Sequence, residues 1–279
     1  MKKSIIGQDY WDRLATEQLS KRTRCIILAE HKRMVHIDLL TRWVHGDSSS
    51  IMLKTDLFEE ASGPDQLLFN LPLIIDDVVG IDISHEVVRQ ARLRAKEHGA
   101  DATKYISCDV RCLPFKDNVF DIIFSGSTLD HFPTEAEIVT SLTELCRVLR
   151  PGGGLILTLD NSSNITYPPY FVMKLWMRLR LAPYIIGRTI PITRLTQILD
   201  EIGFDVEEKT AIFHYIHPDV LIRWLEISLR RLSRGKLENM IMKCLCLLDR
   251  LEKKRTRFLT GRYIAVKAVK RSGFEQSAL

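Results

Sequence analysis

The 279-residue sequence lacks several features that mark membrane, secreted or metal-binding proteins. No apolar run approaches the roughly 20 residues that span a bilayer, and the charged first residues are unlike a secretory signal. The six cysteines show no paired Cys-x-x-Cys spacing, so we expect neither a metal site nor a disulfide framework. These absences favour a cytoplasmic globular protein.

The chain also lacks a Gly/Ser-rich or proline-rich linker and any internal repeat, which favours one elaborated domain. Charge is unevenly distributed along it. Residues 221–279 hold 15 Lys/Arg against 5 Asp/Glu, whereas residues 1–220 hold 25 against 30. A basic C-terminal part is compatible with an anionic partner, but more often it is the solvated face of a helix.

Apolar periodicity predicts helices over residues 8–45 and, after a serine-rich break, an alternation of strands and helices. The predicted strands are residues 51–56, 77–83, 104–109, 120–125 and 155–160. Strands separated by helices form a doubly wound, mostly parallel sheet, which binds ligands at the carboxyl ends of its strands. We therefore predict an α/β fold in three parts: an N-terminal helical segment over 1–46, a ligand-binding core over 47–160 and a C-terminal part over 161–279.

Two carboxylates are expected at the ends of predicted strands. Asp82 is near the end of the second strand, where a carboxylate can accept hydrogen bonds from both hydroxyl groups of a ribose. Ser84 is available to cap the next helix, so Asp82 is not needed for that role. Asp109 ends the third strand, where it can accept a hydrogen bond from an adenine amino group between apolar neighbours.

A combination of short motifs surrounds these two aspartates. It consists of Asp82, Asp109 with Leu113-Pro114-Phe115, Phe120-Asp121-Ile122-Ile123 and Arg150-Pro151-Gly152-Gly153. The combination resembles the class I, Rossmann-like methyltransferases, particularly the branch whose domain is named methyltransferase type 11, over roughly residues 50–160. The resemblance implies S-adenosyl-L-methionine as cofactor and a seven-stranded sheet with an antiparallel last strand. Residues 204–215 and 261–269 fit as its sixth and seventh strands.

The first motif departs from that family's pattern. The family has a glycine-rich turn after the first strand, so that backbone can approach the methionine part of the cofactor. This chain has Lys54-Thr55-Asp56-Leu57-Phe58-Glu59 there, and only Gly63 remains as a candidate for the final glycine. Either these side chains hold the cofactor, with Asp56 or Glu59 on its ammonium group and Lys54 or Thr55 on its carboxylate, or the pocket has lost its cofactor.

The predicted cofactor-binding set joins these side chains to the two aspartates and their neighbours. Its members are Lys54, Thr55, Asp56, Glu59, Asp82, Ile83, Asp109, Val110 and Ser125.

The loop after the fourth strand is where the family places residues that face the acceptor. If the acceptor is a hydroxyl group, a base must take its proton, and His131 or Asp130 is the available candidate. Both also have structural interpretations, with Asp130 capping a helix that begins near Thr134 and His131 simply packed. Residues 160–164 either line the acceptor site or turn the chain.

Segments outside the core are expected to select the acceptor. Residues 167–180 mix aromatic and basic side chains, as would a lid over a lipid-like acceptor, a peripheral membrane contact or an ordinary packed helix. The basic helical insertion over about 216–258 suggests a cap or a homodimer contact. It lacks the interleaved aromatic residues of single-stranded nucleic-acid binding proteins, which disfavours nucleic acid as a partner.

We predict methyl transfer from S-adenosylmethionine to an oxygen or nitrogen atom of a small or medium metabolite. Two alternatives stay open. The missing glycines allow a catalytically degenerate fold that acts as a binding or scaffold protein. A nicotinamide-dependent oxidoreductase is less favoured, because its Gly-x-Gly-x-x-Gly turn is absent and the Asp109 motif has no place in it.

Overall fold

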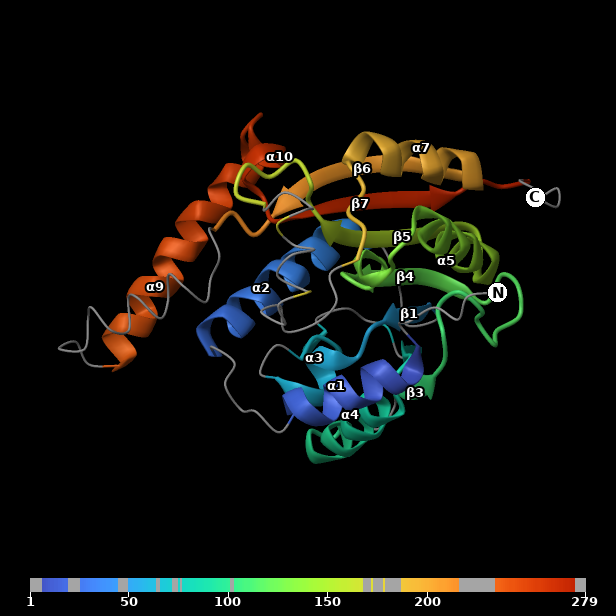
Figure 1. The fold of residues 1–279 in the computed structure, drawn as a ribbon, viewed down its shortest axis with the longest axis horizontal. Coiled ribbons are helices and arrows are strands. Elements are labelled where there is room, and N and C mark those ends of the chain that lie inside the picture. Colours follow the sequence, from blue (N-terminus) through green and yellow to red (C-terminus); the bar gives the residue numbers. More distant parts are fainter. Residues whose placement is uncertain are drawn as a thin grey trace.

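The computed structural model contains one seven-stranded sheet in the order β3-β2-β1-β4-β5-β7-β6 (Figure 1). The residues that it describes are 7–19, 26–44, 50–63, 66–71, 75, 77–100, 103–167, 172, 178, 187–215 and 234–273. The strands are β1 (Ile51–Thr55), β2 (Asp77–Asp82), β3 (Lys104–Ser107), β4 (Phe120–Gly126), β5 (Leu149–Asp160), β6 (Phe204–Ile212) and β7 (Tyr263–Lys270). β7 is antiparallel to both β5 and β6, and the other neighbouring pairs are parallel. The predicted fold is therefore confirmed.

Helices cover both faces of this sheet (Figure 1). They are α1 (Gln8–Leu19), α2 (Ile26–Trp43), α3 (Phe58–Ser62), α4 (His85–Glu97), α5 (Glu135–Val148), α7 (Ile192–Ile202), α9 (Arg234–Asp249) and α10 (Arg257–Thr260), with the 3-10 turns η1 (Leu68–Asn70), η2 (Leu129–His131) and η3 (Arg250–Lys253). One apolar cluster joins α5 and α7 to the sheet, and a second joins α1, α2, α3 and α4 to it.

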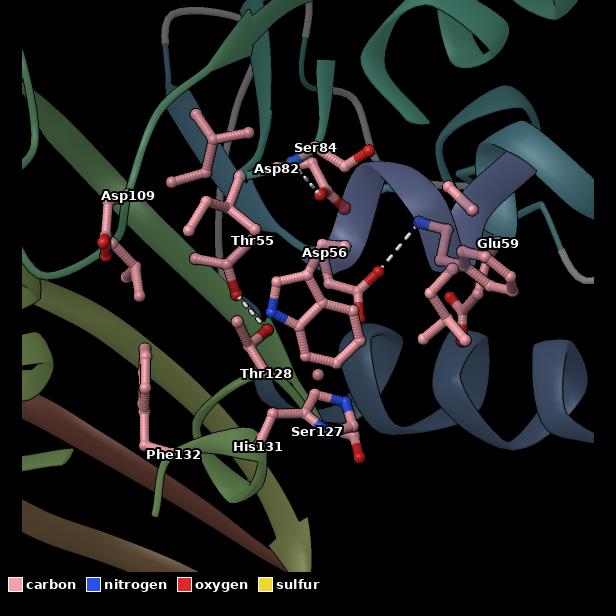
Figure 2. A pocket seen from close by; sticks show the side chains of 18 of the residues that line it. Thr55, Asp56, Glu59, Asp82, Ser84, Asp109, Ser127, Thr128, His131 and Phe132 are labelled. Carbon is pink, nitrogen blue, oxygen red and sulfur yellow. Dashed lines mark hydrogen bonds between the residues drawn. The ribbon is translucent and has the colours of Figure 1, made fainter. Parts of the chain in front are cut away.

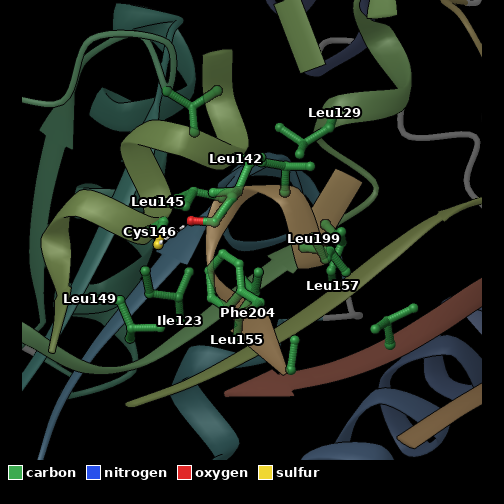
Figure 3. Packing of buried hydrophobic residues seen from close by; sticks show 14 of the residues in the cluster. Ile123, Leu129, Leu142, Leu145, Cys146, Leu149, Leu155, Leu157, Leu199 and Phe204 are labelled. Carbon is green, nitrogen blue, oxygen red and sulfur yellow. Dashed lines mark hydrogen bonds between the residues drawn. The ribbon is translucent and has the colours of Figure 1, made fainter. Parts of the chain in front are cut away.

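The cluster under α5 and α7 fixes the centre of the sheet (Figure 3). Leu142 of α5 and Leu199 of α7 are fully buried, as are Ile123 of β4 and Leu157 of β5. Full burial of such a side chain contributes about 1.5–3 kcal/mol relative to exposure. Because β4 and β5 are anchored in this way, their carboxyl ends present polar residues from a rigid support.

Helix ends follow the expected local chemistry. The Ser84 hydroxyl accepts a hydrogen bond from the backbone N–H of Val87 and caps α4, as the sequence predicts. The Thr134 hydroxyl caps α5 by accepting from Glu137 N, so Asp130 does not have the capping role considered for it. Gly203 ends α7 with φ 108°, a left-handed conformation that glycine adopts without strain.

β5 begins at Leu149, earlier than the predicted start at residue 155. Leu149 pairs with Phe120, and the register then shifts, so the Arg-Pro-Gly-Gly run belongs to an irregular first part of the strand. A Cβ on Gly153 would lie 2.9 Å from the backbone oxygens of Arg150 and Asp121. Close backbone approach therefore requires the glycine there.

Two predicted acceptor-selecting segments fall largely outside the described residues. The lid expected over 167–180 is described only at residues 167, 172 and 178, and the insertion expected over about 216–258 only from residue 234 on. The described part of the insertion contains α9, which packs on α2 through Ile27, Ile241 and Leu245. Among the helices that the structure describes, none combines the length and the apolar character needed to cross a membrane.

Candidate active site

A pocket lies at the carboxyl ends of the central strands, with α1 and α2 contributing its other walls (Figure 2). It is lined by Trp11, Leu14, Ala15, Lys32, Thr55, Asp56, Phe58, Glu59, Ile81, Asp82, Ile83, Ser84, Cys108, Asp109, Val110, Gly126, Ser127, Thr128, His131, Phe132 and Tyr263. The strand order reverses between β1 and β4, which is the position where open α/β sheets bind their ligands. β1, β2 and β3 are each one or two residues shorter than predicted, so Asp56, Ile83 and Asp109 follow the strand ends and enter this pocket.

The Asp82 carboxylate is held by backbone in the middle of the pocket. One oxygen accepts a hydrogen bond from Leu57 N at 3.0 Å, and the other accepts from Ser84 N at 2.8 Å. Burial, and then the nearby Asp56 carboxylate, raise the pKa of Asp82 to about 7. A carboxylate oxygen has more than one acceptor site, so each can accept a further bond from a ligand hydroxyl.

Asp56 occupies the turn that follows β1. Its φ is 65°, in the left-handed region where aspartate and asparagine are the best tolerated residues after glycine. Its Oδ1 accepts from Phe58 N at 2.8 Å, which closes an Asx-type turn. Gly63 instead ends α3 in an extended conformation and does not line the pocket. An aspartate therefore makes the turn for which the sequence offered no glycine.

Lys54 lies behind the pocket wall and is absent from its lining. Its side chain is only 3% exposed, and its Nζ donates to Glu60 Oε2 at 2.9 Å and to the carbonyl oxygen of Asp56. Glu60 also accepts from Leu67 N and Leu68 N, both at 3.2 Å. Burial alone would lower the pKa of Lys54, but the neighbouring carboxylates, Glu60 above all, raise it above its ordinary value. The expectation that Lys54 faces the cofactor therefore does not match its position.

Lys32, and not Lys54, is the lysine that lines the pocket. Lys32, on α2, lines the pocket and places its Nζ 2.5 Å from Glu59 Oε1 of α3. Burial would raise the pKa of Glu59, but the ammonium groups of Lys32 and Lys54 outweigh it and hold that pKa well below the usual range. His36 lies next to them, and burial lowers its pKa to about 3, so its ring is neutral.

Asp109 lies at the opposite end of the pocket from Glu59, with Thr55, Asp82 and Asp56 between them (Figure 2). Both oxygens of Asp109 accept from the Arg111 guanidinium, which also donates to Glu137 at 2.7 Å. This bidentate contact orients the Asp109 carboxylate and leaves it an acceptor. Apolar lining residues accompany it there: Ile83, Val110 and Phe132.

Hydroxyl groups support the centre of the pocket. Thr55 Oγ1 donates to Ser125 Oγ at 2.9 Å and lies 2.6 Å from Thr128 Oγ1. Ser125 is fully buried and absent from the lining, whereas Thr55 and Thr128 belong to it. Ser125 therefore acts on the pocket through Thr55.

The loop after β4 brings His131 into the pocket and leaves Asp130 behind it. The His131 ring packs edge-on against Trp11, with 5.0 Å between ring centroids. Asp130 is 4% exposed, and its Oδ2 accepts from Ser127 Oγ at 2.7 Å and from Asp160 N at 3.2 Å. Asp130 thus ties the β4 loop to the end of β5.

The polar run after β5 turns the chain. Asn161 and Asn164 both donate their side-chain amides to the carbonyl oxygen of Gly261, just before β7. Asp160 lies beside Asp130, and burial, followed by the Asp130 charge, raises the pKa of Asp160 to about 7. The turn interpretation therefore fits the two asparagines.

The contributions of the N-terminal helices to the pocket were not predicted from the sequence. Trp11 and Lys32 line the pocket from α1 and α2, and Asp12 fixes α1 over it. The Asp12 Oδ1 accepts from Ser84 Oγ at 2.6 Å and from Glu86 N at 3.2 Å, at the start of α4. The amphipathic spacing predicted these helices, but nothing local in the sequence shows which strand ends they cover.

Comparisons with known proteins agree with the fold and with the motifs. Residues 59–157 match the family model described as a methyltransferase domain. A ubiquinone/menaquinone biosynthesis C-methyltransferase of Desulfotalea psychrophila is 33% identical over 93 residues, which are 33% of this chain and 35% of that protein. A demethylmenaquinone methyltransferase of Lactococcus lactis is 30% identical over 93 residues, covering 33% and 35%. This chain thus spans about a third of the length of these curated relatives.

A solved structure extends the likeness in fold to nearly the whole chain. The phosphoethanolamine N-methyltransferase 2 of Haemonchus contortus, in complex with phosphomonomethylethanolamine and S-adenosylhomocysteine, superposes with a TM-score of 0.60 at 16% identity. The superposition covers 98% of this chain and 62% of the other. Together with the order of the seven strands, it shows that this chain has the class I methyltransferase fold, and within that fold residues 59–157 match a methyltransferase domain.

Proposed function

We propose that this chain transfers a methyl group from S-adenosylmethionine to an oxygen or nitrogen atom of a small or medium metabolite. The observation that carries the proposal is the order of acidic side chains along the pocket. Asp109, Asp82 and Glu59 follow one another from one end to the other (Figure 2). The cofactor's adenine, ribose and amino-acid groups follow one another in the same order.

The residues present fit this cofactor. Asp82 has a free acceptor site on each oxygen for the two ribose hydroxyls, and the oriented Asp109 carboxylate can accept from the adenine amino group. Ile83 and Val110 supply apolar contacts beside the adenine. Asp56 and Glu59 bring negative charge to the end assigned to the ammonium group. Lys54 and Ser125 act from behind the wall, by holding the turn after β1 and Thr55.

When bound, the cofactor supplies a methyl group on a sulfonium, which an acceptor atom can displace. The chain then has to orient the acceptor and take up its proton. His131 is the base in this proposal, because it lines the pocket beside Ser127. Asp130 positions the base, since it holds Ser127 and the end of β5 at the same time. In this proposal the described helices α1 and α2 of the segment over 1–46 cover the core over 47–160, and the C-terminal part over 161–279 contributes to the acceptor side through described residues such as Tyr263.

Replacing His131 with Gln is expected to lower the rate of methyl transfer to a hydroxyl acceptor by about 10²–10⁴-fold, because general-base catalysis contributes about that much. The affinity for S-adenosylhomocysteine should change less than about threefold. Formation of S-adenosylhomocysteine with a panel of hydroxyl and amine acceptors measures the rate. His85→Gln, at an exposed position on α4, is the matched control. An unchanged rate for His131→Gln would make this histidine a packing residue only.

The acceptor atom is tested by the same panel. A carbon acceptor is the rival outcome, since one relative is named a C-methyltransferase. Product mass spectrometry with lipid-like and polar acceptors distinguishes carbon, oxygen and nitrogen products.

The whole proposal is tested by mass spectrometry of small molecules that co-purify with the protein and by calorimetry with S-adenosylhomocysteine and NAD. We expect S-adenosylmethionine or its product to co-purify, and S-adenosylhomocysteine alone to bind. Preference for NAD would indicate an oxidoreductase, and binding of neither ligand would indicate a degenerate fold with a scaffold role.

A further inference from the structure

We infer that Lys32 of α2, paired with Glu59 of α3, holds the amino-acid end of the cofactor and selects for its zwitterionic charge. The inference rests on the proposed function and assigns a role to a helix outside the matched methyltransferase domain, which begins at residue 59. In this chain an ion pair, in place of a glycine-rich backbone turn, would recognise the methionine group of the cofactor.

Lys32 and Glu59 lie at the end of the pocket that the amino-acid group of the cofactor would occupy. Lys32 and Glu59 line the same pocket, together with Phe58 and Asp56, and they come from two different helices. Glu59 lies at the far end of the pocket from Asp109 (Figure 2). With adenine at Asp109 and ribose at Asp82, the amino-acid end of the cofactor is the group that reaches Lys32 and Glu59.

The other nearby lysine, Lys54, is already engaged in contacts within the protein. The Lys54 ammonium is buried and donates to Glu60 and to the carbonyl oxygen of Asp56, behind the pocket wall. Moving it toward a ligand would leave Glu60 as a fully buried carboxylate without its cation, which is costly. The described residues that line the pocket include one lysine, Lys32, and no arginine.

The charges of Lys32 and Glu59 complement those of an amino-acid group. A zwitterion presents an ammonium and a carboxylate a few bonds apart, and the pocket presents Lys32 and Glu59 in contact at 2.5 Å. Binding can exchange this one ion pair for two, with Lys32 on the ligand carboxylate and Glu59 on the ligand ammonium. Asp56 adds a second carboxylate at the same end. The neutral ring of His36 adds no competing charge there.

Two ligands distinguish recognition of the amino-acid group by Lys32 from a general effect of Lys32 on the pocket. S-adenosylhomocysteine carries the amino-acid group, and 5′-methylthioadenosine has the same adenosine without it. Lys32→Met is expected to lower the affinity for S-adenosylhomocysteine by about 10–100-fold, the value of one charge-assisted hydrogen bond, and to leave methylthioadenosine within twofold. Lys32→Arg should restore most of the affinity for S-adenosylhomocysteine. Lys96→Met, at an exposed position on α4, is the control.

A double variant tests whether Lys32 serves only to neutralise the charge of Glu59. If Lys32 served only to neutralise Glu59, Lys32→Met/Glu59→Gln would recover the affinity for S-adenosylhomocysteine; we expect instead a further loss. Recovery, an equal loss for both ligands, or no loss for either would overturn the inference while leaving cofactor binding intact. Failure of the unaltered protein to bind either ligand would overturn the proposed function itself, and this inference with it.

Discussion

Replacing Asp82 with Asn is expected to lower the affinity for S-adenosylhomocysteine by about 100-fold or more. The variant keeps the shape of the side chain but loses the negative charge that two ribose hydroxyls would share. Each hydrogen bond to a charged group contributes about 1.5–3 kcal/mol, so two of them are worth about two to four orders of magnitude. Calorimetry with S-adenosylhomocysteine and with methylthioadenosine measures the loss, which should be the same for both ligands because both contain the ribose.

The same variant should change how stability depends on pH. The folded-state pKa of Asp82 is raised to about 7, so the folded protein holds this proton more tightly than the unfolded chain does. Its stabilising contribution is therefore present at low pH and is lost as the pH rises toward 7. Between pH 5 and pH 8 the unaltered protein should lose about 3 kcal/mol of unfolding free energy relative to Asp82→Asn. Urea unfolding at several pH values provides the measurement.

Asp77→Asn, at the exposed opposite end of β2, is the matched control and should alter neither property. If Asp82 only accepts hydrogen bonds from Leu57 and Ser84, its replacement would destabilise the protein while ligand affinity stayed the same. That result would show that Asp82 does not bind the ribose of the cofactor.

Replacing Lys54 with Met should cost about 3–5 kcal/mol of unfolding free energy, the usual effect of leaving one partner of a buried ion pair without the other. Glu60 would remain fully buried, and among the residues that the structure describes two backbone N–H groups would be left to stabilise its charge. Burial already raises the pKa of this carboxyl, so the variant should favour its neutral form. Denaturant unfolding at neutral pH measures the cost.

The double variant Lys54→Met/Glu60→Gln should recover much of that loss, since no uncompensated charge is then buried. Lys104→Met, which removes an exposed partner of Asp77, is the control and should have almost no effect on stability. If the Lys54→Met protein instead had normal stability but bound S-adenosylhomocysteine weakly, Lys54 would contact the ligand, as the sequence alone suggested.

The sheet was predictable because its signals are local and repeated. β4 has an apolar centre at Ile122-Ile123-Phe124, Ser84 caps α4, and Gly203 ends α7, so the local sequence marks these elements or their ends. The positions of Asp82 and Asp109 followed, because the carboxyl ends of parallel strands meet at one edge of a sheet.

The motif after β1, residues 54–59, was harder to interpret, because residue type alone does not show which of its side chains are buried and which face the pocket. Lys54 and Lys32 are chemically alike, yet Lys54 points behind β1 to Glu60 while Lys32 reaches the pocket from α2. Whether a lysine near a strand end faces a ligand depends on which helix packs over that end, and this is a long-range contact. The choice of Asp56 for the turn has a local cause, its φ of 65°, but only the backbone reveals it.

The most direct test of the account is a crystal structure of the protein grown with S-adenosylhomocysteine. The account predicts the ribose hydroxyls on the Asp82 carboxylate, the adenine amino group beside Asp109, and the amino-acid group between Lys32 and Glu59. A nucleoside bound elsewhere, or in the reverse direction along this pocket, would contradict it.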